Sequence, residues 1–222
     1  MTLFIVKKLT KMVILIDAGH GIDTKGKQSP KLDQSMDVWD IFTENGRFKE
    51  WKFARVVAHD IVEKLKSYGY DARMLVEEEK DISLKHRVDR VNKVCAKEGS
   101  KNVILVSVHA NAVGDSSKWM TGRGWEAYTT KGTTKSDKLA ECLYNRAEKN
   151  FKGQKIRKDT TDGDSDKEAN FYIILHANCP AVLTENFFYD NKEDLAYMTS
   201  DEGLHAIERT HVEGIIDYIR QL

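Results

Sequence analysis

The stretch Met12-Val-Ile-Leu-Ile-Asp-Ala-Gly-His-Gly21 decides how the rest of the sequence is organised. Its four consecutive apolar residues, Val13–Ile16, predict a short buried strand, and the Asp-Ala-Gly that comes next ends it. His20 then lies just past the carboxyl end of that strand, in a glycine-flanked turn where backbone and ligand can approach closely. The stretch therefore indicates an imidazole at one edge of a sheet.

Two later segments repeat this arrangement of an apolar strand followed by a chemically useful side chain. Val103–Val108 runs directly into His109, and Ala181–Thr184 runs into Glu185. If the three strands are parallel, both imidazoles and the carboxylate gather at the edge where open α/β sheets usually bind their ligands.

The rest of the sequence alternates between expected strands and amphipathic helices. Apolar residues at three- and four-residue intervals predict helices over 50–68, 84–96, 133–151 and 202–219. Further strands are expected over 70–76, 124–129 and 171–175, whereas 22–49 and 152–168 are expected to be loops. This alternation predicts an α/β fold: a single domain with a twisted, mostly parallel central sheet of about six strands, flanked by helices on both faces.

Composition excludes several classes of protein. The chain has 222 residues and a formal net charge of zero, which argues against nucleic acid as a partner bound through bulk charge. No apolar run approaches the roughly 20 residues that a membrane span needs, so we expect no stable membrane association. The three cysteines are odd in number and lack C-x-x-C spacing, and we interpret them as buried reduced thiols.

The first eleven residues differ in pattern from the rest of the chain. Lysines come after the apolar residues of this segment, which is the wrong order for a signal peptide, and no small-residue cleavage site is seen. We therefore interpret residues 1–11 as an N-terminal appendage and residues 12–222 as the catalytic domain.

The residue types at the predicted sheet edge are those of a catalytic zinc site, in which three protein ligands leave one position open for water. His20, His109 and one carboxylate satisfy that count. The residues alone do not decide which carboxylate is the third ligand. Glu44 lies beside an Asn-Gly turn, Glu50 faces inward at the start of a helix, and Glu185 is either a ligand or a general base.

Five motifs, in order, cover nearly the whole chain from Met12 onward. They are Val13-Ile-Leu-Ile-Asp-Ala-Gly-His-Gly21, Glu50 at a helix start, Ser83-Leu-Lys-His-Arg-Val88 with Asn92, Ser107-Val-His-Ala-Asn-Ala112, and Pro180-Ala-Val-Leu-Thr-Glu185. Together they resemble the zinc-dependent N-acetylmuramoyl-L-alanine amidases of the amidase-3 type. The resemblance implies cleavage of the amide between N-acetylmuramic acid and L-alanine in peptidoglycan.

The resemblance also implies roles for single residues. His20, Glu50 and His109 would hold one zinc ion (Zn2+), and Glu185 would be the catalytic carboxylate that takes a proton from water and passes it to the departing nitrogen. Two further residues are candidates for substrate contact. Asn111 either orients substrate or caps a turn, and Arg157 lies in a charged loop that we expect to border the cleft and meet carboxylates of the stem peptide.

Two other functions stay open at this point: a zinc peptidase that acts on ordinary peptides, and an inactive peptidoglycan-binding module. We expect peptidoglycan as the partner and a monomer as the oligomeric state. Because peptidoglycan is the expected substrate, the expected setting is the bacterial cell wall. No export signal is seen, so we expect the chain to be cytoplasmic until it is released. The chain would reach the wall from the cytoplasm, as a phage-type endolysin does, or by another export route. Arg87 is expected to be a structural ion-pair residue.

Overall fold

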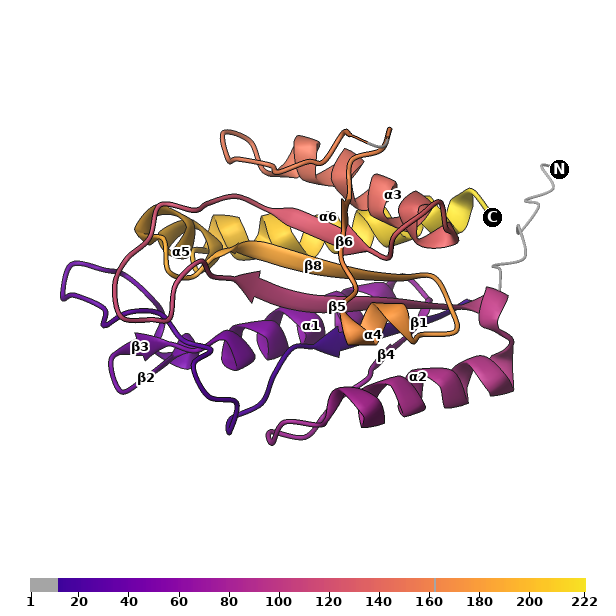
Figure 1. Ribbon diagram of the computed structural model, residues 1–222, viewed down its shortest axis with the longest axis horizontal. Helices are drawn as coiled ribbons and strands as arrows, with labels where there is room; N and C mark the ends of the chain where they lie inside the picture. Colours follow the sequence, from indigo (N-terminus) through magenta and orange to yellow (C-terminus); the bar gives the residue numbers. More distant parts are fainter. Residues whose placement is uncertain (1–11, 162) are drawn as a thin grey trace, which may run out of the picture.

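The chain folds around one six-stranded sheet with helices on both faces (Figure 1). The computed structural model describes residues 12–161 and 163–222, so the expected appendage 1–11 lies outside the described residues. In spatial order, the strands are β4 (Asp71–Met74), β1 (Val13–Ala18), β5 (Val103–Asn111), β8 (Ala181–Phe188), β6 (Glu126–Thr129) and β7 (Lys167–Glu168). The first four are parallel to one another, and only the β6–β8 pairing of this sheet is antiparallel. The predicted fold class is confirmed.

Successive residues of the central strands enter two separate cores because side chains alternate between the faces of a sheet. Ile14, Ile16 and their neighbours pack with helices α1 (Glu50–Ser67), α3 (Lys135–Asn150) and α6 (Asp201–Arg220). Val13 and Leu15 pack with α2 (Leu84–Glu98) and α4 (Tyr172–Leu175) on the other face. Helix α5 (Lys192–Met198) comes after β8 in the chain. Every residue of β1 is buried, as expected for a strand inside a parallel sheet.

The strand expected over 171–175 is wrong: this segment contains the single helical turn α4. Ile173 and Ile174 are buried against the sheet, whereas Phe171, Tyr172 and Leu175 are 39–45% exposed. A short apolar run does not distinguish a buried strand from a short helix. Here the run covers one face of the sheet instead of extending it.

The segment 22–49, expected to be irregular, contains some regular structure. A short 3-10 helix, η1 (Asp40–Phe42), precedes a hairpin of β2 (Thr43–Glu44) and β3 (Arg47–Phe48). The two residues between these strands, Asn45 and Gly46, both have positive φ, which matches the tight turn that an Asn-Gly pair favours. Phe42 and Phe48 are fully buried. The hairpin is therefore anchored on the core directly before α1 begins.

Smaller expectations have mixed outcomes. The three cysteines are free, as predicted, although Cys179 is only partly buried. No helix in the described part of the chain is long and apolar enough to cross a membrane. A short 3-10 helix, η2 (Ser100–Asn102), precedes β5. His211 of α6 is fully buried beneath β8, where its Nε2 lies 2.9 Å from the hydroxyl of Thr184.

Candidate metal centre and catalytic site

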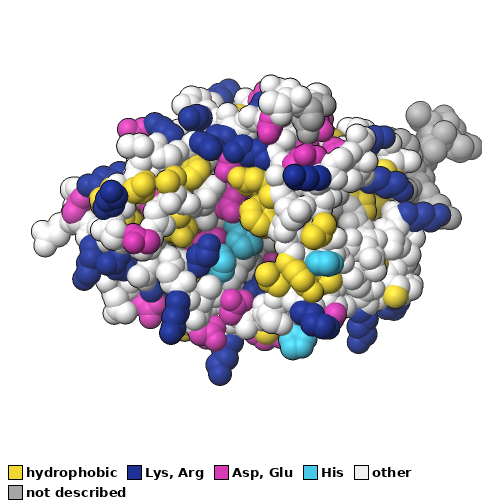
Figure 2. All heavy atoms as spheres, in the orientation of Figure 1, with side chains coloured by type: hydrophobic (Ala, Val, Ile, Leu, Met, Phe, Trp, Pro, Cys, Tyr) yellow, Lys and Arg dark blue, Asp and Glu magenta, His cyan; other side chains and the backbone are white. Residues whose placement is uncertain are grey.

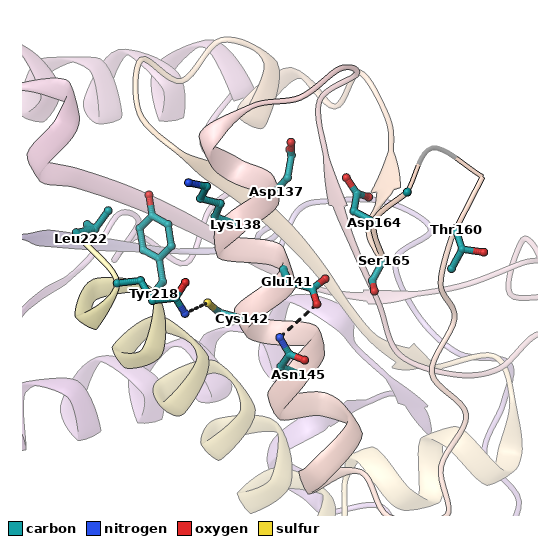
Figure 3. Close-up of a pocket in the computed structure, with 12 residues that line it drawn as sticks. Asp137, Lys138, Glu141, Cys142, Asn145, Thr160, Asp164, Ser165, Tyr218 and Leu222 are labelled. Atoms are coloured by element: carbon teal, nitrogen blue, oxygen red, sulfur yellow. Dashed lines mark hydrogen bonds between the residues drawn. The ribbon is translucent and has the colours of Figure 1, made fainter.

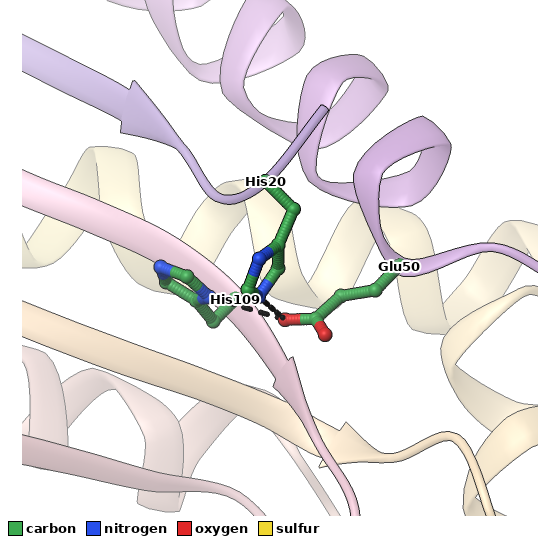
Figure 4. Close-up of side chains that lie close together, drawn as sticks. All are labelled: His20, Glu50 and His109. Atoms are coloured by element: carbon green, nitrogen blue, oxygen red, sulfur yellow. Dashed lines mark hydrogen bonds and ion pairs between the residues drawn. The ribbon is translucent and has the colours of Figure 1, made fainter. Parts of the chain in front are cut away.

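Three side chains from three separate elements converge at the carboxyl end of the sheet (Figure 4). His20 follows β1, Glu50 is the first residue of α1, and His109 lies near the end of β5. Their donor atoms all lie within 4.8 Å of one another. Oε1 of Glu50 lies 3.2 Å from Nε2 of His20 and 3.1 Å from Nδ1 of His109. The structure thus brings together the two expected imidazoles and one of the three candidate carboxylates.

The local backbone explains why His20 points inward. His20 has a φ of +64°, a left-handed conformation that is uncommon for a residue other than glycine. Its carbonyl oxygen accepts hydrogen bonds from the guanidinium groups of Arg87 and Arg55, at 3.1 and 3.3 Å. These contacts hold the unusual backbone in place. Arg87 is almost fully buried and also pairs with Asp17 at 2.6 Å, which confirms its expected structural role.

Gly19 makes room for His109. A Cβ atom at position 19 would lie 2.3 Å from Cε1 of the His109 ring, closer than side chains can approach. The glycine that precedes His20 therefore allows two imidazoles from different strands to pack edge to face, with ring centroids 4.9 Å apart.

Glu50 is held as a buried anion. It is 1% exposed, its backbone N–H donates to the carbonyl of Lys27, and Oε1 accepts from the N–H of Ala110 at 3.2 Å. Burial alone would raise the pKa of this carboxyl, but its contacts with the imidazoles of His109 and His20 outweigh burial and lower it. Burial also lowers the pKa of His109, which favours the neutral form of this imidazole. A carboxylate and a neutral imidazole are the forms that bind a metal.

Two unsatisfied atoms suit a bound cation. Among the described residues, no hydrogen bond reaches Nε2 of His20 or Oε2 of Glu50, although both atoms are buried. Buried polar atoms without partners are costly, and a cation would satisfy both. In a tetrahedral zinc site, two ligand atoms lie about 3.3 Å apart, since each is roughly 2.0–2.1 Å from the ion. The 3.1 and 3.2 Å separations at Glu50 fit that arrangement.

Glu185 stands beside this cluster as a separate carboxyl group. In the sheet register it is opposite His109 on one side and Glu126 on the other. Burial, followed by the negative charge of Glu50, raises the pKa of Glu185 well above its ordinary value. Oε2 is buried and has no hydrogen-bond partner among the described residues. A carboxyl group in this setting holds a proton more readily than an exposed carboxyl group does.

The other candidate residues occupy different positions. Glu44 is 44% exposed, pairs with Lys49 and lies apart from the cluster. Asn111 and Arg157 both bind the carboxylate of Glu126, a buried residue that the sequence alone did not single out. Lys27 was also not predicted. Its ammonium group lies 3.8 Å from Oε2 of Glu50.

The cleft consists of two hollows that share Glu185 and Lys27 in their walls. One, of about 340 Å³, is lined by both histidines and by apolar side chains that include Phe171 and Tyr172. The other, of about 270 Å³, is lined by Asn111 and Tyr189. The carboxyl group of Glu185 therefore faces open space from which a substrate can approach.

A larger hollow, of about 710 Å³, lies elsewhere, between α3, the end of α6 and the loop around Ser165 (Figure 3). Its polar side chains pair locally: Glu141 accepts a hydrogen bond from Asn145, and Gln221 donates to Cys142. No set of donors like that at Glu50 converges there among the described residues. The converging donor atoms therefore favour the smaller cleft, and not this larger hollow, as the functional site.

A family model described as Amidase_3, N-acetylmuramoyl-L-alanine amidase, matches residues 14–217. The chain belongs to the Amidase_3 family. The endolysin of Bacillus phage SPP1 is 28% identical over 217 residues, which are 93% of this chain and 66% of the endolysin. The chain covers smaller shares, 38% and 35%, of two further relatives from Bacillus licheniformis and Bacillus anthracis.

Solved structures of N-acetylmuramoyl-L-alanine amidases share the fold. The N-acetylmuramoyl-L-alanine amidase from Clostridium difficile 630 has a TM-score of 0.73 and 23% identity, covering 95% of this chain and 98% of that one. The amidase AmiC2 of Nostoc punctiforme has a TM-score of 0.71 and 22% identity, with the same coverage. At these identities the likeness supports the architecture of this Amidase_3 member, and function rests on its own site.

Proposed function

We propose that this Amidase_3 member hydrolyses the amide bond between N-acetylmuramic acid and L-alanine in peptidoglycan, as an endolysin-type enzyme of the bacterial cell wall. One observation carries the proposal: three converging metal-type donors lie beside a separate carboxyl group whose pKa is raised. A wall-binding module without activity has no need for both. The family match supports this choice of substrate.

His20, Glu50 and His109 would hold the zinc ion. When bound, zinc supplies a Lewis acid that polarises a carbonyl group and makes water more acidic. Glu50 is fixed as an anion by its contacts to both imidazoles and to the N–H of Ala110, so the donor set is preorganised. The ligands come from rigid elements, which favours a defined geometry.

Glu185 would move the proton. Its carboxylate accepts a proton from the attacking water and then, as a carboxylic acid, delivers that proton to the nitrogen that leaves with alanine. An ordinary carboxyl group is too acidic to serve as a good donor at neutral pH. Burial corrects this by favouring the neutral form of Glu185.

The proposal is tested by separating metal binding from proton transfer. The Glu185→Gln variant is expected to keep one zinc per chain and to release new alanine amino groups from purified sacculi about 10²- to 10⁴-fold more slowly. The His109→Ala variant is expected to lose zinc and activity together. Glu44→Gln, which removes an exposed carboxylate outside the cluster, serves as the matched control and should behave like the parent.

Three outcomes would contradict the proposal. Loss of zinc in Glu185→Gln would make this residue a ligand. Cleavage of ordinary peptides, with muramoyl-alanine left intact, would indicate a peptidase. Binding of sacculi by the zinc-loaded parent without release of alanine amino groups would indicate a binding module.

A further inference from the structure

Glu126 forms a second buried carboxylate site, next to Glu185 but outside the proposed metal centre. It is 1% exposed and lies directly opposite Glu185 on the neighbouring antiparallel strand. Both of its oxygens are fully engaged. Oε1 accepts from Asn111 at 2.6 Å and Tyr128 at 2.9 Å, and Oε2 accepts from Arg157 at 2.6 Å and Lys167 at 2.9 Å. Glu126 therefore fixes four side chains, of which Asn111 lines the cleft.

Arg157 is held in a way that leaves part of its guanidinium group available. Only Nε contacts Glu126, and the group lies over the ring of Phe188, 5.3 Å from its centroid. Within residues 12–161 and 163–222, no hydrogen bond involves its two terminal nitrogens. The side chain is 31% exposed. An arginine fixed at Nε, with both terminal nitrogens accessible, can bind a carboxylate with two parallel hydrogen bonds.

Lys167 repeats this pattern beside Arg157. Its ammonium group contacts Oε2 of Glu126, lies 5.8 Å from the ring centroid of Tyr128 and is 25% exposed at the side chain. An ammonium group has three donor hydrogens, and Glu126 uses one direction only. Both cations are therefore anchored by the same buried anion and retain donors for a ligand.

The charges at this position do not cancel. Although burial alone would raise the pKa of Glu126, its contacts with Lys167 and Arg157 outweigh burial and lower it, so the group is a single anion facing two cations. Figure 2 shows lysine and arginine side chains bordering the acidic groups at the centre of this face. Arg157 and Lys167 together carry one positive charge more than the carboxylate that holds them.

We propose that Arg157 and Lys167, positioned by Glu126, bind a carboxylate on the second residue of the stem peptide. This inference rests on the proposed function and specifies its substrate. Neighbouring strands are about 4.8 Å apart, which is more than one extended residue and less than two. A carboxylate one or two residues from the scissile amide therefore reaches this site when the amide lies beside Glu185. The site therefore distinguishes a stem peptide whose second residue has a free carboxylate from one in which an uncharged carboxamide replaces that carboxylate.

Binding of the two product dipeptides tests the inference without requiring activity. Both dipeptides are capped at the γ-carboxyl group as the methylamide, so that they differ only at the α position. L-alanyl-D-glutamate γ-methylamide has a free α-carboxylate, and L-alanyl-D-isoglutamine γ-methylamide has an α-carboxamide. They are titrated separately into the zinc-loaded protein by calorimetry. The carboxylate dipeptide is expected to bind at least about tenfold more tightly, as charge-assisted hydrogen bonds imply. The double variant R157Q/K167Q should bring the two affinities within about twofold, mainly by weakening the carboxylate dipeptide.

Lys158→Gln is the matched control. Lys158 follows Arg157 in the sequence, has the same 31% side-chain exposure and pairs with Glu148, away from Glu126. The Lys158→Gln variant also removes one positive charge. If it keeps the preference for the carboxylate dipeptide, that preference comes from Arg157 and Lys167 and not from the overall positive charge of the surface. If the double variant does not fold, Arg157→Lys keeps the charge but lacks the fork of terminal nitrogens, and should lose most of the preference.

Equal affinities in the parent, no measurable binding of the carboxylate dipeptide, or an equal loss of selectivity in Lys158→Gln would overturn the inference. Failure of the proposed function appears differently. The same two dipeptides, each joined through alanine to N-acetylmuramic acid, serve as substrates. If the parent hydrolyses neither of them, the proposed reaction is wrong, while the binding data still decide whether Arg157 and Lys167 form a carboxylate site. If it hydrolyses both equally well, with equal KM, the reaction stands and the inference fails.

Discussion

Gly19→Ala should disable the proposed metal centre without replacing any of the three residues that supply its donor atoms. The added Cβ would lie 2.3 Å from Cε1, 2.4 Å from Nδ1 and 2.8 Å from Nε2 of His109. Non-bonded carbon atoms pack at about 3.5–4.0 Å, so the imidazole has to move by roughly 1 Å or more. The ring is coupled directly to the donor set, since Nδ1 lies 3.1 Å from Oε1 of Glu50.

A movement of that size exceeds what zinc coordination tolerates. Ligand distances in metal sites are defined to within about 0.2 Å. Changes to groups that only orient a ligand already cost about 10- to 100-fold in metal affinity. Displacing His109 itself should therefore lower zinc affinity by about 100-fold or more, which competition with a chelator of known affinity measures.

The same collision predicts a signature in stability. Gly19→Ala should lower the melting temperature of the parent, because the new methyl group meets the His109 ring. In a His109→Ala background the ring is absent, and the same substitution should cost much less. This double-mutant cycle isolates the contact between the two positions. Parent-like zinc affinity in a folded Gly19→Ala protein, or equal destabilisation in both backgrounds, would refute the reasoning.

Two further predictions concern stability. Burial raises the pKa of Asp166 from 3.8 to about 7, so the folded state holds this proton more tightly and loses stability as pH rises from about 4 through 7. Asp166→Asn should therefore raise the free energy of unfolding relative to the parent by up to roughly 4 kcal/mol at pH 8 and by almost nothing at pH 4. Thermal melts measure this difference. A difference that did not grow with pH would contradict the prediction. Arg87→Met should cost about 3–5 kcal/mol because it leaves Asp17 buried without its cation, measured as a fall in melting temperature of roughly 6–20 °C. An unchanged midpoint would show that the pair is dispensable.

The sequence determined most of the fold because its strongest signals are local. Four apolar residues before Asp17 and the regular spacing along the helices predicted the strands and helices that build the sheet and both covering layers. His20 and His109 were predictable since each follows or ends an apolar strand. The segment 171–175 was not, because five apolar residues carry too little periodicity to identify a helical turn.

The residues around Glu126 show why part of the site was beyond prediction. Glu126 meets Glu185 only because β6 lies next to β8 and runs antiparallel to it, and no local pattern reports which strands are neighbours. Asn111 and Arg157 were expected near the cleft for separate reasons, yet they are 46 positions apart and contact the same carboxylate. The two histidines of the proposed metal centre follow from where β1 and β5 end, whereas the carboxylate site proposed at Glu126 follows from the lateral order of the strands. Substitutions in β6 should therefore change substrate preference and leave zinc affinity intact. Substitutions at Gly19 should lower zinc affinity and leave substrate preference intact.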